Sequence, residues 1–164
     1  MGEAADRYII SVKKILVPID RSEYNNKILE YAISLSKAWD AKITAIHVLN
    51  MGHEIGDGKD KEIKPEKIQE EKKYAEVLLN EIDLTAKKEG INIETEVLEK
   101  NDKVGKTIIE YAKKNKMDII VIGTRGMTAV EEYFFGSVVK DVFQYAHCPV
   151  FAVRWQALFL TDWP

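Results

Sequence analysis

The sequence predicts an α/β fold, a doubly wound three-layer sandwich with helices on both faces of a parallel sheet. Two observations support this class. Short β-rich runs alternate with longer segments of helical periodicity along most of the 164 residues. The run at 117–122 is largely apolar, which is typical of a strand covered on both faces. Strands that alternate with helices imply parallel pairing and right-handed crossovers.

The first β-rich run extends from Ile15 to Ile19 and stops at Asp20. Ser22 is then available as an N-cap, because a serine oxygen can accept a hydrogen bond from an amide of the first helical turn. Apolar residues at near-helical spacing mark the inner face of the helix that follows: Tyr24, Ile28, Ala32, Leu35 and Trp39.

A second strand is predicted over 42–48. The stretch 50–64 is rich in glycine and charge, which indicates a mobile loop. Pro65 suits the first turn of the next helix, which is expected to reach about Glu89 and to end at Gly90. The inward positions of this helix are Ile68, Ala75, Leu78, Ile82 and Ala86.

The second half of the chain repeats the alternation. Apolar and polar residues alternate over 91–98, which predicts an edge strand with one wet face. A third helix is expected over 103–115 and is followed by the strand at 117–122. The last helix is expected over 137–146 and the last strand over 149–155.

Polar and apolar candidates for ligand contact stand at the strand ends. In doubly wound sheets, ligands bind outside the carboxyl ends of the strands. Asp20, Val48 and Gly123 each stand at such an end. Asp20 would accept from ribose hydroxyls or help to hold Mg²⁺, or else it merely caps the next helix. Val48 and Ile122 would sandwich an adenine, or else belong to the core.

Glycines surround the end of the fourth predicted strand. Gly123 and Gly126 bracket a turn whose amides can form an anion nest. Gly136 and Ser137 open a helix, whose first amides lack intrahelical partners and carry a partial positive charge. Arg125 would add a charged contact. The two sets of donors suit a polyphosphate, although the same glycines also occur as ordinary punctuation between elements.

Composition excludes several classes of protein. The formal charge of −3 gives no electrostatic reason to expect binding to nucleic acid or to an anionic membrane. No run of 18 or more apolar residues is present, and the N-terminus does not resemble a signal peptide. Cys148 is the one cysteine, so no internal disulfide can form. We expect a single cytoplasmic domain spanning 1–164, with its core at about 13–154.

Two apparent motifs do not fit the chemistry that they suggest. Gly-Lys-Thr at 105–107 matches the end of a P-loop, but Lys100 stands where the first glycine is required. His147 and Cys148 are adjacent at the entry to a strand, so their side chains point to opposite faces and do not form a catalytic dyad. The histidines are scattered and predict no zinc site.

With these residues placed, the sequence resembles the universal stress protein family from about Lys13 to Arg154. Gly123-x-x-Gly126, nine residues and then Gly136-Ser137 match the nucleotide-binding signature of its ATP-binding branch. Two further segments are similar to that branch: Pro18-Ile19-Asp20 and His147-Cys148-Pro149-Val150.

The resemblance implies a five-stranded sheet of order 3-2-1-4-5, of the adenine nucleotide alpha hydrolase-like kind, with bound ATP and a homodimer. Asp20 would hold ribose, and Val48 adenine. The residues expected around the nucleotide are Pro18, Ile19, Asp20, Val48, Ile122, Gly123, Thr124, Arg125, Gly126, Gly136, Ser137, Val138 and Val139. Val139 departs from the family, whose ATP-binding members often carry a hydroxyl there. The apolar tail 155–164 is a second departure and puts the usual dimer geometry in doubt.

Three functions follow as alternatives. The leading hypothesis is an ATP-dependent switch or binding module in a stress response, with an unidentified protein partner. The second is a slow Mg²⁺-dependent ATPase, for which Glu131 and Glu132 are candidates to position water, although solvation is their simpler explanation. The third is a chaperone-like dimer that binds no nucleotide.

Overall fold

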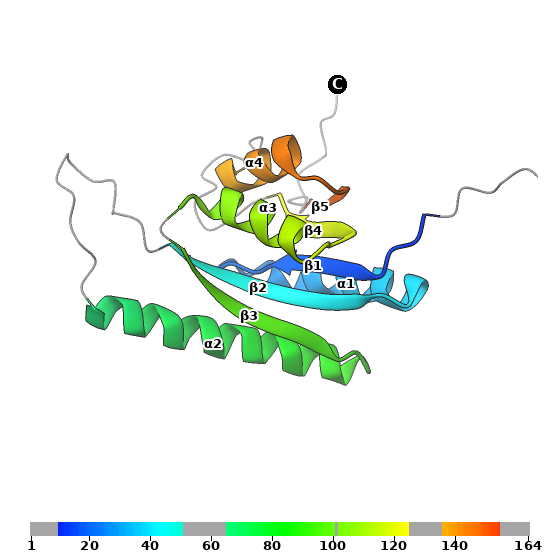
Figure 1. Cartoon of the computed structure of the whole chain (residues 1–164). Helices are drawn as coiled ribbons and strands as arrows, with labels where there is room; N and C mark the ends of the chain where they lie inside the picture. The colour runs from blue at the N-terminus through cyan, green and yellow to red at the C-terminus, as the bar shows by residue number, and fades with distance from the viewer. Residues whose placement is uncertain (1–9, 51–64, 101, 125–135, 155–164) are drawn as a thin grey trace, which may run out of the picture.

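The computed structural model describes residues 10–50, 65–100, 102–124 and 136–154, and its strands and helices alternate along the chain (Figure 1). The elements are β1 (Lys14–Pro18), α1 (Asn25–Trp39), β2 (Lys42–Asn50), α2 (Pro65–Lys88), β3 (Ile93–Lys100), α3 (Val104–Lys114), β4 (Ile119–Gly123), α4 (Ser137–Tyr145) and β5 (Val150–Val153). Most of the 50–64 loop, the tail 155–164, and Arg125 with Gly126 lie outside the described residues.

The five strands form one parallel sheet in the order β3-β2-β1-β4-β5, which is the order that the resemblance implies. Chain order reverses beside β1, because β1 pairs with β2 on one side and with β4 on the other. Figure 1 shows α3 and α4 together above the sheet, whereas α2 lies along its opposite face with α1. The predicted three-layer sandwich is therefore confirmed.

Each face of the sheet has its own apolar cluster. Ile15, Val17 and Ile43 point toward α1 and α2 and are fully buried. Leu16 and Ile46, which alternate with them along β1 and β2, point toward α3 and α4. A strand that contributes to two cores needs apolar residues on both faces, which explains why β1 lacks the alternation of a half-exposed strand.

The N-cap predicted at Ser22 is wrong. The helix begins at Asn25 after Tyr24, and no side chain caps its amides. The Ser22 amide instead donates to the Asp20 carboxylate over 2.9 Å, which turns the chain before the helix starts. Because the helix starts three residues after Ser22, the serine stands before the cap position rather than at it.

Several strand and helix ends differ from the predictions by a few residues. β1 begins one residue earlier than predicted, and β3 begins two residues later. β2 continues to Asn50 rather than stopping at Val48. β4 ends at Gly123, one residue later than predicted. Pairing with β3 extends β2, because Leu49 and Asn50 find partners in Glu99 and Lys100. The edge position of β3 is as predicted.

The end of α2 at Gly90 is confirmed. Gly90 has a φ of +76°, in the left-handed region that favours glycine. Its amide donates to the carbonyl of Lys87, and the Ile91 amide donates to the carbonyl of Ala86, both over 3.0 Å. This pair of bonds is a Schellman motif, which satisfies carbonyls at the end of the helix.

Candidate functional site

The carboxyl ends of β1, β2 and β4 lie side by side. Pro18 pairs with Ile46, and the Ile19 amide continues this ladder by donating to the Ile46 carbonyl over 2.8 Å. β1 also pairs with β4, through Leu16 and Ile120. Asp20, Val48 and Gly123 follow these paired positions, so the fold brings the three predicted strand ends to one edge of the sheet.

A small hydrogen-bond network shapes the segment at 19–22. The Asn25 amide nitrogen Nδ2 donates to the Asp20 carbonyl over 2.6 Å and to the Ser22 carbonyl over 3.0 Å. Asn25 is buried at the start of α1, and Asp20 is half-buried. The Asp20 carboxylate accepts the Ser22 amide through Oδ1. Asn25 therefore fixes the backbone from which the Asp20 carboxylate projects.

His47 supports the same segment from β2. Its Nδ1 lies 2.8 Å from the carbonyl oxygen of Ile19, and the side chain is buried. Since a carbonyl only accepts, Nδ1 carries the proton in this contact. Burial lowers the pKa of His47, and the nearby charge of Arg21 acts in the same direction. The neutral imidazole is thus the form that holds the segment.

The end of β4 is joined to the start of α4. The Thr124 amide donates to the Val153 carbonyl over 3.0 Å, and the Thr124 carbonyl accepts from the Gly136 amide over 3.4 Å. Gly136 is the N-cap residue, and no side chain caps the amides of α4. Thr124 is buried, whereas the Ser137 side chain is exposed. The end of β4, at Gly123 and Thr124, therefore lies next to the N-terminus of α4.

The apolar candidates differ in burial. Ile19 is 3% exposed and belongs to the cluster beneath α1 and α2. Ile122 and Val139 are 5% and 3% exposed, inside the cluster beneath α3 and α4. The half-buried candidates are Pro18, Val48 and Val138. Val48 packs against the edge of the second cluster and keeps part of its surface open.

Sequence reasoning missed three residues at this edge. Asn25 and His47 hold the segment at 19–22, and Arg21 ties it to α2 through Glu71. A buried histidine in an otherwise apolar strand was the visible signal for His47. Asn25, five residues after Asp20, carried no comparable signal because an asparagine at a helix start is common.

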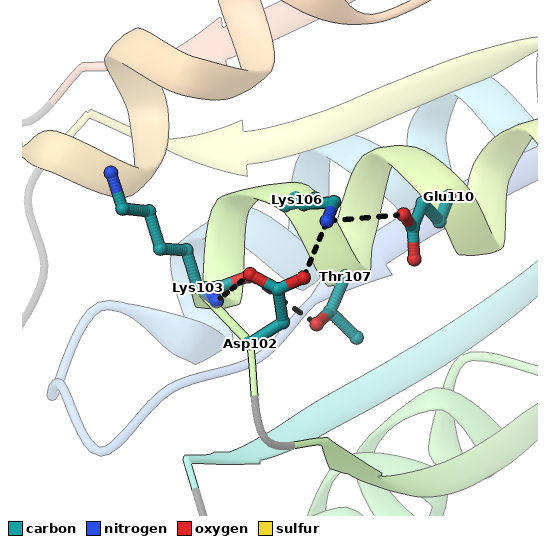
Figure 2. A network of polar contacts seen from close by, with 5 residues as sticks. All are labelled: Asp102, Lys103, Lys106, Thr107 and Glu110. Atoms are coloured by element: carbon teal, nitrogen blue, oxygen red, sulfur yellow. Dashed lines mark hydrogen bonds and ion pairs between the residues drawn. The ribbon is translucent and has the colours of Figure 1, made fainter. Parts of the chain in front are cut away.

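The Gly-Lys-Thr tripeptide is structural, as the sequence predicts (Figure 2). Lys106 lies between two acids, with Nζ at 2.6 Å from an Asp102 oxygen and 3.9 Å from a Glu110 oxygen. The Thr107 side chain is buried, and its hydroxyl donates to the Lys103 carbonyl over 3.3 Å. A lysine bound by two carboxylates on the helix surface is not the free cation that a phosphate site requires.

Other chemical groups were also compared with their predicted roles. Cys148 is half-buried against the cluster beneath α3 and α4, and burial raises the pKa of its thiol. This environment opposes thiolate formation. Within the described ranges, no three His, Cys, Asp or Glu side chains are grouped as a metal site, and no helix is long and apolar enough to span a membrane.

Comparisons with known proteins agree with this architecture. The profile of the Universal stress protein family matches residues 11–154. Universal stress protein MJ0531 from Methanocaldococcus jannaschii is 35% identical over 144 residues, covering 87% of this chain and 82% of that relative. The solved structure of UspA from Lactobacillus plantarum has a TM-score of 0.74 at 24% identity, covering 87% of this chain and 98% of that one. The universal stress protein from Archaeoglobus fulgidus in complex with dAMP has a TM-score of 0.63 at 24% identity, covering 88% and 98% of the two chains. The profile match over most of the sequence, together with the identity to MJ0531, shows that this chain belongs to the universal stress protein family.

Proposed function

We propose that this protein binds ATP at the carboxyl edge of its sheet and acts as a nucleotide-dependent switch or binding module in a stress response. One observation carries the proposal. The ends of β1, β2 and β4 meet at an edge where Gly136, at the start of α4, is bonded to Thr124. An acidic group, an apolar side chain and a helix N-terminus at one edge of the sheet support a nucleotide site there.

The adenosine half of the proposed site is built on β1 and β2. Asp20 would accept from ribose hydroxyls through its carboxylate, which the Ser22 amide contacts, while Asn25 holds the Asp20 backbone carbonyl. Val48 offers a partly open apolar side chain for adenine, and Pro18, also half-buried, is paired with Ile46, two residues before Val48. Ile19 and Ile122, both buried, would form the floor of the site rather than its walls.

The phosphate half is built on β4 and α4. We assign the phosphates to amides near Gly123, Thr124, Gly136, Ser137 and Val138, with Val139 contributing by backbone only. The proposed contacts of Arg125 and Gly126 rest on the sequence signature. The first amides of α1 and α3 also lack a side-chain cap, so this feature does not by itself indicate a phosphate site. The start of α4 is distinguished by its contact with the end of β4.

Mg²⁺ is a natural companion of the proposed ATP. This ion usually keeps several waters and is held by one or two carboxylates together with the phosphates of the substrate. Asp20 fits an indirect role, since Ser22 occupies Oδ1 and no larger acidic cluster is present among the described residues. Magnesium would neutralise phosphate charge there.

Two further observations support a nucleotide ligand. The Archaeoglobus fulgidus relative, which shares the fold, was solved with dAMP. The Ser22 hydroxyl, beside Asp20, is buried without a hydrogen-bond partner in the described part of the protein. Buried polar atoms are nearly always satisfied, so a hydroxyl of this kind favours a missing polar partner such as water or ligand.

We further propose a homodimer formed through the edge of β5. Val150–Val153 pairs with β4 on one side, and in the described part of the sheet β5 is the terminal strand. Exposed strand edges favour pairing with another chain. Phe151 lies half in solvent, with its ring centroid 5.8 Å from that of Tyr31, and would be covered in such a dimer.

Nucleotide content and affinity together test the proposed function. Small molecules extracted from the purified protein are identified by mass spectrometry, and Mg-ATP binding is measured by calorimetry. Asp20→Asn removes the charge while keeping the side-chain shape. Losing a charged hydrogen bond worth about 1.5–3 kcal/mol should weaken ATP binding by about 10- to 100-fold.

Asp118→Asn is the matched control. Asp118 accepts the amides of Lys13 and Lys14 over 2.7 and 2.8 Å, at the amino end of the strands. The same chemical change there should leave ATP affinity unchanged in the folded protein. Absence of ATP binding by the wild type would contradict the proposed function, and release of ADP with steady turnover would favour the ATPase alternative.

A further inference from the structure

Arg21 links the proposed adenosine segment to α2. It follows Asp20 directly, and its guanidinium forms an ion pair with Glu71 of α2. The central carbon of this guanidinium group, Cζ, lies 4.3 Å from the centroid of the ring of Tyr74, which is also on α2. Glu71 and Tyr74 are three residues apart, so they share one face of the helix. Arg21 therefore holds two neighbouring residues of α2 at once.

The other contacts of this segment lead elsewhere. The Ile19 carbonyl is held by His47 of β2 over 2.8 Å, and the Asp20 carbonyl by Asn25 of α1 over 2.6 Å. These buried anchors fix the backbone on both sides of Asp20. Arg21 has its side chain 33% exposed and adds the connection to α2. The residue next to Asp20 is thus the link between this segment and α2.

α2 is joined to the same edge of the sheet by a second ion pair. Lys72, next to Glu71, lies with Nζ 2.8 Å from an Glu99 oxygen of β3. Ala75 and Leu79, four and eight residues after Glu71, lie between Glu71 and Lys72 around the helix and are buried. Two ion pairs therefore flank the buried face of the first half of α2, and one of them is made by Arg21, next to Asp20.

We propose that Arg21 is a positioning residue, which sets the ribose-contacting geometry of Asp20 and transmits nucleotide binding to the first half of α2. The proposal rests on the proposed function, since it assigns the coupling of that same site. Coupling between two sites is reciprocal. If the α2 contact favours the nucleotide-competent position of Asp20, then bound nucleotide must stabilise the contact between Arg21 and α2.

The test is a double-mutant cycle on ATP affinity, using Arg21→Gln, Glu71→Gln and the double variant. Each single substitution should raise the Kd for Mg-ATP by about three- to tenfold, the range expected from a partly exposed ion pair combined with a cation–π contact. The double variant should bind Mg-ATP no more weakly than the weaker-binding single variant, because the two substitutions remove the same contact. Arg21→Lys keeps the charge and should recover part of the affinity.

The second measurement is amide hydrogen exchange with and without Mg-ATP. A residue that only stabilised the fold would not produce the nucleotide-dependent change expected here. ATP should slow exchange in the first half of α2, around 69–76, more than around 80–88, and Arg21→Gln should abolish this difference. The control is Lys37→Gln, which breaks an ion pair with Glu89 of 3.4 Å at the other end of α2. It should change neither the Kd nor the exchange difference.

The outcomes separate the two proposals. If the wild type binds ATP but Arg21→Gln binds it equally well, or the exchange difference persists in that variant, the role of Arg21 is overturned and the proposed function stands. If the wild type binds no ATP, both proposals are overturned. Additive effects of Arg21→Gln and Glu71→Gln would also overturn the coupled contact.

Discussion

Replacing Gly105 by alanine should destabilise the protein, although alanine normally favours a helix. Gly105 lies in the first turn of α3, where α3 packs against α4. A Cβ at this position would lie 2.7 Å from the Cβ of Asp141 and 3.0 Å from its Oδ2. Ordinary carbon contacts are about 3.5–4.0 Å long, so the two helices would have to separate by about 1 Å.

Two opposing effects set the magnitude. Helix propensity favours alanine by at most about 1 kcal/mol. Overpacking of a close contact costs about 1–3 kcal/mol. We therefore expect a net loss of up to about 2 kcal/mol in the free energy of unfolding. For a chain of this size, the melting temperature should fall by about 2–4 °C per kcal/mol.

Urea denaturation of Gly105→Ala, Asp141→Gly and the double variant measures this contact directly. Asp141→Gly removes the opposing Cβ, so the combined variant should be more stable than the sum of the single effects predicts. The Asp141→Gly variant alone reports the propensity cost of glycine in α4. A Gly105→Ala protein that is more stable than the wild type, with additive double-variant energies, would refute the close helix contact.

Three further predictions concern the residues around the site. Burial lowers the pKa of His47 below 6.5, so on acidification the imidazole is protonated in the unfolded chain before it is protonated in the folded protein. The contribution of neutral His47 to stability is therefore complete above pH 6.5. It falls as the pH drops toward the folded pKa, by at most about 1.4 kcal/mol per pH unit. His47→Gln should remove this component from denaturation midpoints measured from neutral to acid pH, and an unchanged profile would contradict the buried-neutral assignment. Asn25→Ala removes the hydrogen bonds that Nδ2 donates to the carbonyls of Asp20 and Ser22, and should lower the unfolding free energy by about 1–3 kcal/mol in thermal melts. An unchanged unfolding free energy would mean that water donates to these carbonyls in place of Nδ2. Because burial raises its thiol pKa, Cys148 should be alkylated by iodoacetamide more slowly in the native protein than in urea, and equal rates would show that the thiol is not protected.

Local patterns predicted the elements well where one residue type has one physical role. Gly90 ends α2 because glycine alone enters the left-handed region without strain, and Pro65 begins the described part of the same helix. The run at 119–122 is a buried strand because every position is apolar. Ser22 failed as a cap because the helix begins only at Asn25, so Ser22 stands before the N-cap position, and its buried hydroxyl has no partner among the described residues.

The candidate site was predicted as an edge of the sheet but not as a set of contacts. Asp20, Val48 and Gly123 lie near the carboxyl ends of β1, β2 and β4 because parallel strands align these ends, although β2 continues two residues past Val48. Ile122 and Val139 turned out to be buried in the cluster beneath α3 and α4, which periodicity does not distinguish from an open wall. Their depth depends on how the two helices pack.

The sequence by itself determined the order of strands and helices along the chain, part of the inward faces of α1 and α2, and the strand edge that carries the candidate residues. These properties are local, since they depend on side-chain period and on backbone freedom at a few residues. Only the tertiary structure decided that His47 holds the carbonyl of Ile19 and that Arg21 contacts Glu71. Such contacts join segments 28 and 50 residues apart in the chain, and they depend on strand register and helix packing, which no local pattern specifies.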